Sequence, residues 1–311
     1  MTTTGESRRV MVIPHTGRRQ AIAATTALVR GLAGAGLHVI VPSSKARKIG
    51  DIASLVSSVD QPQAELRHTE LIIVVGGDGT ILSAAQLSHG SGVPLLGINL
   101  GHVGFLAESE REEVGEVVRR VAAEQYEVEE RMTLDVTVSM EGQVLERNFA
   151  VNEVTVEKAE PQRMVEVAVE IDARPVSTFG ADGVCLATPT GSTAYAFSAG
   201  GPVVWPQVQA LVLAPISAHA LFARPLVVSP SSVLAVEVLA PSPPALMVCD
   251  GRRTRELPPG SRIEVTKGSH PLRLARLATA PFTDRLVAKF QLPVTGWRGP
   301  GTRAPRPPED M

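Results

Sequence analysis

The sequence has few of the features that mark several large classes of protein. It holds only two cysteines, Cys185 and Cys249, each inside an apolar run, which is too few for a disulfide framework. We therefore expect buried free thiols and a reducing, cytoplasmic compartment. No apolar run approaches the roughly 18 residues that indicate a membrane-spanning helix. The apolar stretch after the first basic pair is also too short for a signal peptide, so we expect no contact with a membrane.

The sequence also has no large excess of positive or negative charge. The 30 Lys and Arg residues and 32 Asp and Glu residues give a formal charge of −2, so no bulk field favours nucleic acid or an anionic membrane. The histidines follow no zinc-site spacing, which predicts no metal site made of protein ligands alone. A Walker sequence is absent, and the one G-x-G-x-x-[GA] match, at 299–304, has no strand before it.

The apolar segments that are present follow an order typical of an α/β domain. The expected strands cover residues 10–13, 37–43, 71–75 and 93–99, and the helical patterns cover 20–32, the segment from the glycine-rich turn to about Leu87, and 108–124. Strands that are apolar throughout and alternate with helices form parallel sheets covered on both faces. We therefore expect a Rossmann-like α/β nucleotide-binding domain over residues 1–126.

The hydrophobic period changes after Arg131. Apolar and polar residues now alternate, which indicates antiparallel strands with one face in solvent. The alternating segments are 134–140, 165–171, 233–239, 245–249 and 262–266. These segments predict a β-rich domain over 127–281. Residues 282–298 are expected to pack back onto the first domain, and the Pro- and Gly-rich tail, 299–311, is expected to be disordered.

The turn GGDGT, residues 76–80, follows an apolar strand and opens a helix. Glycines let backbone N–H groups approach an anion, the helix start adds positive potential, and Thr80 is expected to cap that helix. Asp78 would repel phosphate unless it holds Mg²⁺ or accepts a proton from a nucleophile. This favours phosphoryl transfer to a hydroxyl. The alternatives are a βα turn with Asp78 as a solvated capping residue or, less favoured because a helix follows, a hairpin.

A second polar constellation lies in the β-rich half. GADG at 180–183 is followed by TPTGSTAY at 188–195, which places five hydroxyl side chains within eight residues. Such a segment suits the hydroxyls of a ribose and the edge of an adenine. The alternative is a polar loop of serine and threonine turns.

Four further positions carry two interpretations each. Asn152 and Glu153 are adjacent, so both reach one ligand only at a strand end or irregularity, and they could instead be a polar pair on an edge strand. Arg163 could bind a phosphate or be a solvated arginine. His219 is more typical of a structural histidine than of a proton shuttle. Residues 250–252, DGR, read first as a hairpin turn.

Taken together and in this order, these motifs resemble the NAD kinase family. The resemblance spans about residues 9–297, and TPTGSTAY is its most specific part. SAHALFARP at 217–225 and GHVGFL at 101–106 add to it, with Val103 where the family more often has leucine. GGDGT alone is shared with diacylglycerol and sphingosine kinases and, loosely, with phosphofructokinases.

The resemblance implies an active site between two domains and transfer of the terminal phosphoryl of ATP, or of polyphosphate, to the 2′-hydroxyl of the adenosine ribose of NAD⁺. It implies Mg²⁺ held mainly by substrate phosphates, without protein metal ligands, and a homodimer or homotetramer. Asp78 would orient or deprotonate the hydroxyl, and Gly76, Gly77, Gly79 and Thr80 would shape the phosphate site. The residues expected to bind NAD are Asp78, Gly79, Asn152, Glu153, Arg163, Asp182, Thr193, Ala194, Tyr195, Ser198 and Asp250.

Two other functions fit part of this pattern. A lipid kinase of the diacylglycerol type shares GGDGT, but it would be expected to carry a second glycine-rich motif like G-T-G-N-D, which this sequence lacks. A non-catalytic NAD-binding regulator would keep the nucleotide motifs. The presence of Asp78 disfavours that interpretation.

Overall fold

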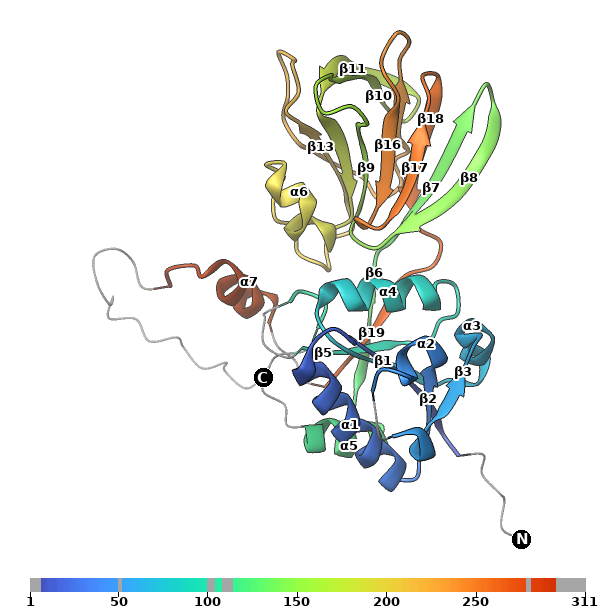
Figure 1. The fold of residues 1–311 in the computed structure, drawn as a ribbon. Helices are drawn as coiled ribbons and strands as arrows, with labels where there is room; N and C mark the ends of the chain where they lie inside the picture. The colour runs from blue at the N-terminus through green and yellow to red at the C-terminus, as the bar shows by residue number, and fades with distance from the viewer. Residues whose placement is uncertain (1–6, 50–51, 100–103, 108–113, 278–280, 295–311) are drawn as a thin grey trace.

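The computed structural model describes residues 7–49, 52–99, 104–107, 114–277 and 281–294. An α/β domain and a β-rich domain lie one above the other, and helix α4 (Asp78–Ser88) lies at the boundary between them (Figure 1). Among the described residues, no helix is both long enough and apolar enough to span a membrane.

The first domain is built on a seven-stranded sheet of order β3-β2-β1-β4-β5-β19-β6. Its strands are β1 (Arg9–Pro14), β2 (His38–Pro42), β3 (Ser57–Val59), β4 (Leu71–Val75), β5 (Leu95–Ile98), β6 (Glu127–Arg131) and β19 (Leu272–Arg276). Every pair in it is parallel except β19 with β6. The sheet confirms the expected α/β class. Strands β2 and β3 are added on one side of β1, and β4 and β5 are added on the other side, so the direction of strand addition changes between β1 and β4.

Helices cover both faces of this sheet. α1 and α5 pack together on one face, and α4 lies on the other, between the sheet and the β-rich domain (Figure 1). The helices of this domain are α1 (Arg19–Gly34), α2 (Ser43–Ala46), α3 (Pro62–Glu65), α4 and α5 (Val114–Ala122), with 3₁₀ turns at Ala53–Leu55 and Leu66–His68. The first six residues of the expected helix 108–124 lie outside the described residues.

The second domain consists of two six-stranded antiparallel sheets, of orders β11-β10-β15-β18-β7-β8 and β14-β13-β12-β9-β16-β17. Valines such as Val136, Val156 and Val236 meet between them in one shared core, so the two sheets form a sandwich. The strands are β7 (Leu134–Met140), β8 (Gln143–Ala150), β9 (Glu153–Lys158), β10 (Val165–Ile171), β11 (Arg174–Ala181), β12 (Gly183–Ala187), β13 (Leu211–Ile216), β14 (Leu226–Val228), β15 (Leu234–Val238), β16 (Ala245–Cys249), β17 (Arg253–Leu257) and β18 (Ser261–Lys267).

Two strands lie in a different sheet from the one the sequence suggested. The expected β-rich domain, 127–281, includes β6 and β19, yet both strands extend the sheet of the α/β domain. β6 is the edge strand, with only Arg131 buried, whereas β19 beside it is buried at four of its five positions. The chain therefore crosses between the domains twice, before β7 and after β18.

Helix α7 (Phe282–Phe290) contacts both domains. Phe282 lies 5.6 Å from Phe105, ring centre to ring centre, and 5.0 Å from Trp205, while Phe290 lies 4.5 Å from Phe197. We expected residues 282–298 to pack onto the first domain. That expectation covers the contact with Phe105 but not the contacts with Trp205 and Phe197 of the second domain. The end of that segment, 295–298, and the tail expected to be disordered, 299–311, lie outside the described residues.

Gly97 allows β5 to pack closely beneath α4, so its substitution tests how tightly the helix is seated. A Cβ at Gly97 would lie 2.5 Å from Cδ1 of Ile81 and 3.1 Å from Cα of Ala107. We expect Gly97→Ala to lower the free energy of unfolding by about 1–3 kcal/mol. Gly115→Ala is the control, because a Cβ there meets no atom within 4 Å and helix α5 favours alanine. Equal stability of the two variants in urea unfolding would contradict the packing argument.

Candidate active site

The glycine-rich turn is formed where the buried strand β4 ends. A Cβ on Gly76 would lie 2.6 Å from Oγ1 of Thr80 and 3.1 Å from Cβ of His15, so the turn requires glycine there. Helix α4 begins at Asp78, with Gly77 as its N-cap. The expectation that Thr80 caps this helix is therefore wrong. Thr80 is already in the first turn, and its hydroxyl packs against Gly76 instead.

The Asp78 carboxylate is oriented by the segment that follows β5. The backbone N–H of Phe105 donates to its Oδ2 at 3.0 Å, and that of Leu106 donates to its Oδ1 at 3.2 Å. Gly104 allows this approach, since a Cβ there would lie 2.4 Å from Oδ1. In the sequence, GHVGFL is distinctive only by its resemblance to the family, and nothing there predicts this role of its last three residues. Positions 101–103 lie outside the described residues.

The DGR turn joins the motifs of the two domains. Asp250 and Gly251 have φ values of +51° and +63°, which suits the tight hairpin turn between β16 and β17. The next residue, Arg252, donates from Nη1 to the carbonyl of Gly79 at 3.2 Å, across the domain boundary. The hairpin interpretation of DGR was correct, but it missed this contact with the glycine-rich turn.

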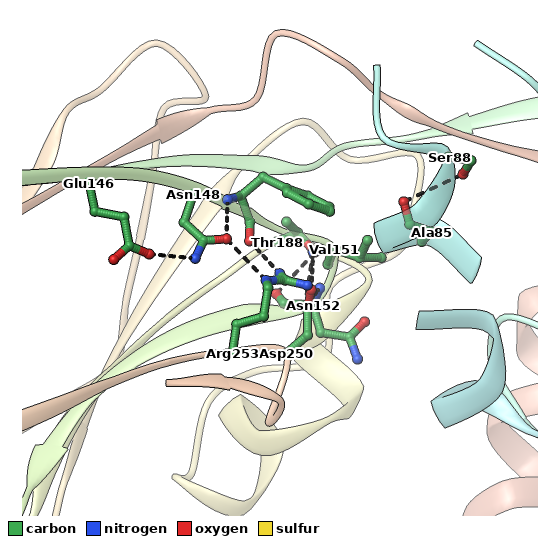
Figure 2. A network of polar contacts seen from close by, with 10 residues as sticks. Ala85, Ser88, Glu146, Asn148, Val151, Asn152, Thr188, Asp250 and Arg253 are labelled. Carbon is green, nitrogen blue, oxygen red and sulfur yellow. Dashed lines mark hydrogen bonds and ion pairs between the residues drawn. The ribbon is translucent and has the colours of Figure 1, made fainter. Parts of the chain in front are cut away.

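The side chain of Asp250 is 1% exposed and organises the start of β9 (Figure 2). Its carboxylate accepts hydrogen bonds from the backbone N–H groups of Val151 at 2.9 Å and Asn152 at 2.7 Å. Arg253 donates to it at 3.0 Å. Asp250 holds the backbone that presents Asn152 and Glu153. The expectation that it also binds NAD stays a prediction.

The hydroxyl-rich segment wraps around the same backbone. The hydroxyl of Thr188 donates to the carbonyl of Val151 at 2.7 Å. Gly191 packs directly against Asn152, where a Cβ would lie 2.0 Å from the carbonyl oxygen. A 3₁₀ turn at Gly191–Thr193 and the short helix α6 (Tyr195–Ser198) follow. Asn152 and TPTGSTAY are thus one structural unit, far apart in sequence.

Glu153 is 6% exposed at the start of β9. The backbone N–H of Tyr195 faces its Oε2 at 3.4 Å. Burial, with the negative charge of Asp250 as a second cause, raises the pKa of Glu153 to about 7. Near neutral pH this carboxyl group is divided between a form that donates a hydrogen bond and a form that only accepts.

Two of the expected NAD-binding residues lie at the other end of the same strands. In the register of β12 with β9, Ala187 pairs with Glu153, whereas Gly183 pairs with Glu157. Asp182 precedes Gly183 and forms an ion pair with Lys158 at 2.6 Å. Arg163 is 59% exposed and its Nη1 lies 3.9 Å from a carboxylate oxygen of Glu160. Within one chain, neither residue joins the cluster around Asn152.

The remaining expected residues lie on the exposed side of the hydroxyl-rich unit. Thr193 and Ala194 are half-buried, while Tyr195 and Ser198 are exposed. Together with the glycine-rich turn, they define the class of protein: a Rossmann-like domain and a β-sandwich, with a nucleotide-type phosphate turn and a hydroxyl-rich loop at their boundary.

Known proteins share this arrangement over both domains. Residues 10–126 match the ATP-NAD kinase N-terminal domain, and residues 151–277 match the ATP-NAD kinase C-terminal domain. The chain is 58% identical over 295 residues to NAD kinase 2 of Streptomyces coelicolor, a match that covers 94% of this chain and 97% of that protein. It is 54% identical over 302 residues to the NAD kinase of Leifsonia xyli, covering 95% and 98% of the two chains.

Solved structures agree with these matches. An NAD kinase from Archaeoglobus fulgidus in complex with ATP superposes with a TM-score of 0.69 at 29% identity, covering 91% of this chain and 98% of that one. Yeast NADH kinase complexed with NADH has the same fold, with a TM-score of 0.83 at 22% identity and coverage of 94% and 90%. The chain belongs to the NAD kinase family, as its motifs predicted. Neither the lipid kinase nor the non-catalytic regulator receives support from these matches.

The raised pKa of Glu153 makes the stability of the fold depend on pH. Because the folded chain binds this proton more tightly than the unfolded chain, its contribution is fully present below about pH 4.5 and is lost as pH rises through about 7. We expect Glu153→Gln to gain up to about 3 kcal/mol relative to the parent protein between pH 5 and pH 8. Urea unfolding of both proteins at the two pH values measures this. A difference that does not change with pH would contradict the assignment.

Proposed function

We propose that the chain transfers the terminal phosphoryl group of ATP to the 2′-hydroxyl of the adenosine ribose of NAD⁺, releasing NADP⁺ and ADP. One observation carries the proposal: the line of contacts from Gly79 through Arg252 and Asp250 to Asn152. It brings a turn suited to phosphate next to a loop suited to ribose, and each comes from a different domain. Family membership supports the choice of ATP and NAD.

Asp78 is the proposed catalytic residue. Its carboxylate accepts the 2′-hydroxyl proton while a bond forms between the 2′-oxygen and the γ-phosphorus. The bond from that phosphorus to the β–γ bridging oxygen breaks, and ADP leaves with the electron pair. The N–H groups of Phe105 and Leu106 limit the orientations of the carboxylate. Phosphoryl transfer is accelerated mainly by positioning the reacting groups and by stabilising charge. A carboxylate held in one orientation therefore contributes directly to the rate.

The acceptor nucleotide is proposed to bind along the unit formed by Asn152, Glu153 and residues 193–198. With a pKa of about 7, Glu153 can donate to or accept from a ribose hydroxyl. The exposed ring of Tyr195 offers a stacking surface and a phenol. Roles for Asp182 and Arg163 stay predictions, and require a part of the ligand, or a second copy of the chain, at the far end of β12.

Mg²⁺ is the proposed metal. The described residues contain no group of three or more His, Cys, Asp or Glu side chains that could hold an ion. A phosphate-bound Mg²⁺ suits such a site, since this ion commonly takes one or two carboxylates and completes its shell with phosphate oxygens and water. Held by the phosphates of the donor, the ion would neutralise developing charge on the transferred group.

We also propose a cytoplasmic homodimer or homotetramer. Cys185 and Cys249 are buried and unpaired, and burial raises the pKa of the Cys249 thiol to about 12, which fits a reducing compartment.

Leu221 and Phe222, in the family-like segment 217–225, are exposed apolar side chains of the kind found at subunit contacts. Light scattering on the purified protein gives the subunit number, and a monomer at micromolar concentration would contradict this part of the proposal.

The proposed reaction is tested with folded, purified protein supplied with NAD⁺, Mg²⁺ and either ATP or inorganic polyphosphate. We expect NADP⁺ with ATP, detected by an NADP⁺-specific dehydrogenase. Production with polyphosphate would extend the donor range. Absence of NADP⁺ with both donors would reject the proposal.

Asp78→Ala should separate catalysis from binding. We expect kcat to fall about 10²- to 10⁴-fold, because the proton acceptor is lost, while NAD⁺ still binds when measured by calorimetry. Gln86→Ala, about two turns further along α4, is the matched control, since Gln86 is exposed and lies outside the lining of the cavity beside the glycine-rich turn. Turnover by Asp78→Ala close to that of the parent protein would refute the catalytic role.

A further inference from the structure

The segment that orients Asp78 is itself held by two arginines. Phe105 and Leu106 give their N–H groups to the Asp78 carboxylate, and their carbonyl oxygens accept hydrogen bonds in turn. Nη1 of Arg276 donates to the carbonyl of Leu106 at 2.8 Å, and Nη1 of Arg285 donates to the carbonyl of Phe105 at 3.3 Å. Both arginines lie outside the sequence motifs that carry the family resemblance.

The topology of the sheet explains why these residues meet. β4, β5 and β19 are parallel neighbours, so their carboxyl ends lie at one edge of the sheet. Asp78 follows β4, the segment with Phe105 and Leu106 follows β5, and Arg276 is the last residue of β19. The contacts from Arg276 to Asp78 therefore run along this edge across three adjacent strands.

Arg276 is fixed on its other side by the edge strand β6. Its side chain is 9% exposed, and its Nε donates to Oε1 of Glu129 at 2.5 Å. Arg131 donates to the same oxygen at 2.7 Å. Burial opposes the ionisation of Glu129, yet the charges of Arg276 and Arg131 outweigh it and hold the pKa of Glu129 below its ordinary value. A guanidinium held at Nε by a carboxylate directs its remaining N–H groups along fixed lines.

Arg285 acts on the peptide group that contacts the carboxylate. The carbonyl of Phe105 and the N–H of Leu106 belong to one planar peptide group. Arg285 donates to its oxygen while its N–H donates to Oδ1 of Asp78. A cation at the carbonyl end polarises the N–H end, which strengthens the bond to the carboxylate. Arg285 comes from α7, which also packs Phe282 against the ring of Phe105.

We propose that Arg276 is a positioning residue for phosphoryl transfer. Together with Arg285 it fixes the two peptide groups that hold the Asp78 carboxylate, and it acts on the reaction only through them. The inference rests on the proposed function, because it takes Asp78 as the proton acceptor. It gives β19 and α7 a part in catalysis through contacts within the chain, without contact with either substrate.

The first test reads the contact itself and needs no turnover. Amide hydrogen exchange of the full-length protein is followed by mass spectrometry on peptides that contain residues 105 and 106. We expect Arg276→Met to speed exchange of these amides about tenfold, because the segment opens more often once its carbonyl contact is lost. Arg273→Met is the matched control, since Arg273 donates to the carbonyl of Gly92 from the opposite end of β19. Equal exchange at 105 and 106 in the two variants would overturn the inference.

The second test separates positioning from binding. We expect Arg276→Met to lower kcat about ten- to a hundredfold, since a misplaced reacting group has effects of this order, with the KM values for ATP and NAD⁺ within about twofold. Arg276→Lys should recover part of the loss, because lysine keeps the charge but cannot make both guanidinium bonds. Arg273→Met should keep kcat within about twofold. A kcat for Arg276→Met equal to that of Arg273→Met, or a loss confined to KM, would count against positioning.

Arg285→Ala extends the kinetic test to α7. We expect kcat to fall about fivefold with both KM values unchanged, because the peptide group keeps its place but loses the polarising cation. Lys289→Ala, an exposed cation one turn further along the same helix, is the control and should match the parent protein. Equal kcat in these two variants would remove Arg285 from the proposal.

A double-mutant cycle identifies the route by which Arg276 acts. Added to Asp78→Ala, Arg276→Met should lower kcat no further, since the carboxylate through which it acts is already gone. A purely structural arginine would lower kcat by the same factor in both backgrounds, and that result would overturn the inference.

The outcomes separate this inference from the proposed function. Absence of NADP⁺ from the parent protein would reject the function, while faster exchange in Arg276→Met would still support the hold on the segment. Faster exchange with a parent-like kcat would overturn the catalytic part of the inference alone. Thermal unfolding identifies any variant that is not folded. If Arg276→Met is one, Arg276→Lys and Arg285→Ala decide both tests by the same criteria.

Discussion

The carboxylate of Asp250 accepts hydrogen bonds from two consecutive backbone amides and pairs with Arg253, almost entirely out of contact with water. Breaking a buried ion pair of this kind by removing one partner typically costs about 3–5 kcal/mol. Here the pair fixes the start of β9, so the position of Asn152 and the wrapping of Thr188 and Gly191 around it depend on it. The adjacent Arg252 then reaches the glycine-rich turn. The DGR turn therefore determines both the shape of the hydroxyl-rich segment and its position relative to Asp78.

The two domains are coupled by packing as well as by this turn. Helix α4 shares a core cluster with Phe149 and Val151 of the β-sandwich. His89, just after the helix, stacks on Phe149 with ring centres 3.6 Å apart, and Arg253 lies over the same ring at 4.5 Å. Both ends of α4 are therefore held by the second domain, one at Gly79 and the other at His89. A helix fixed at both ends can present Asp78 in a constant position.

Local sequence patterns predicted the parallel strands, the alternating strands and the glycine-rich turn, because each depends on neighbours in the chain. They did not predict where Asp250 points, since its partners, Val151 and Asn152, lie about a hundred residues earlier. β6 and β19 were placed in the β-rich domain because the boundary was set where the hydrophobic period changes, and a change of period does not identify the neighbouring strand. Thr80 was misplaced as a cap because Gly77 offers no side chain to mark the helix start.

Burial and the same buried charge together set the chemistry of the neighbouring carboxyl group. Burial raises the pKa of Glu153 to about 7, and the negative charge of Asp250 is the second cause of that shift. A carboxyl group divided between its two forms near neutral pH can adapt to a hydroxyl that donates or one that accepts. Asp78 lies in a different setting, half-buried and bonded to two amides. The two carboxyl groups therefore differ in their surroundings: Glu153 is buried near another carboxylate, whereas Asp78 is held by two backbone N–H groups.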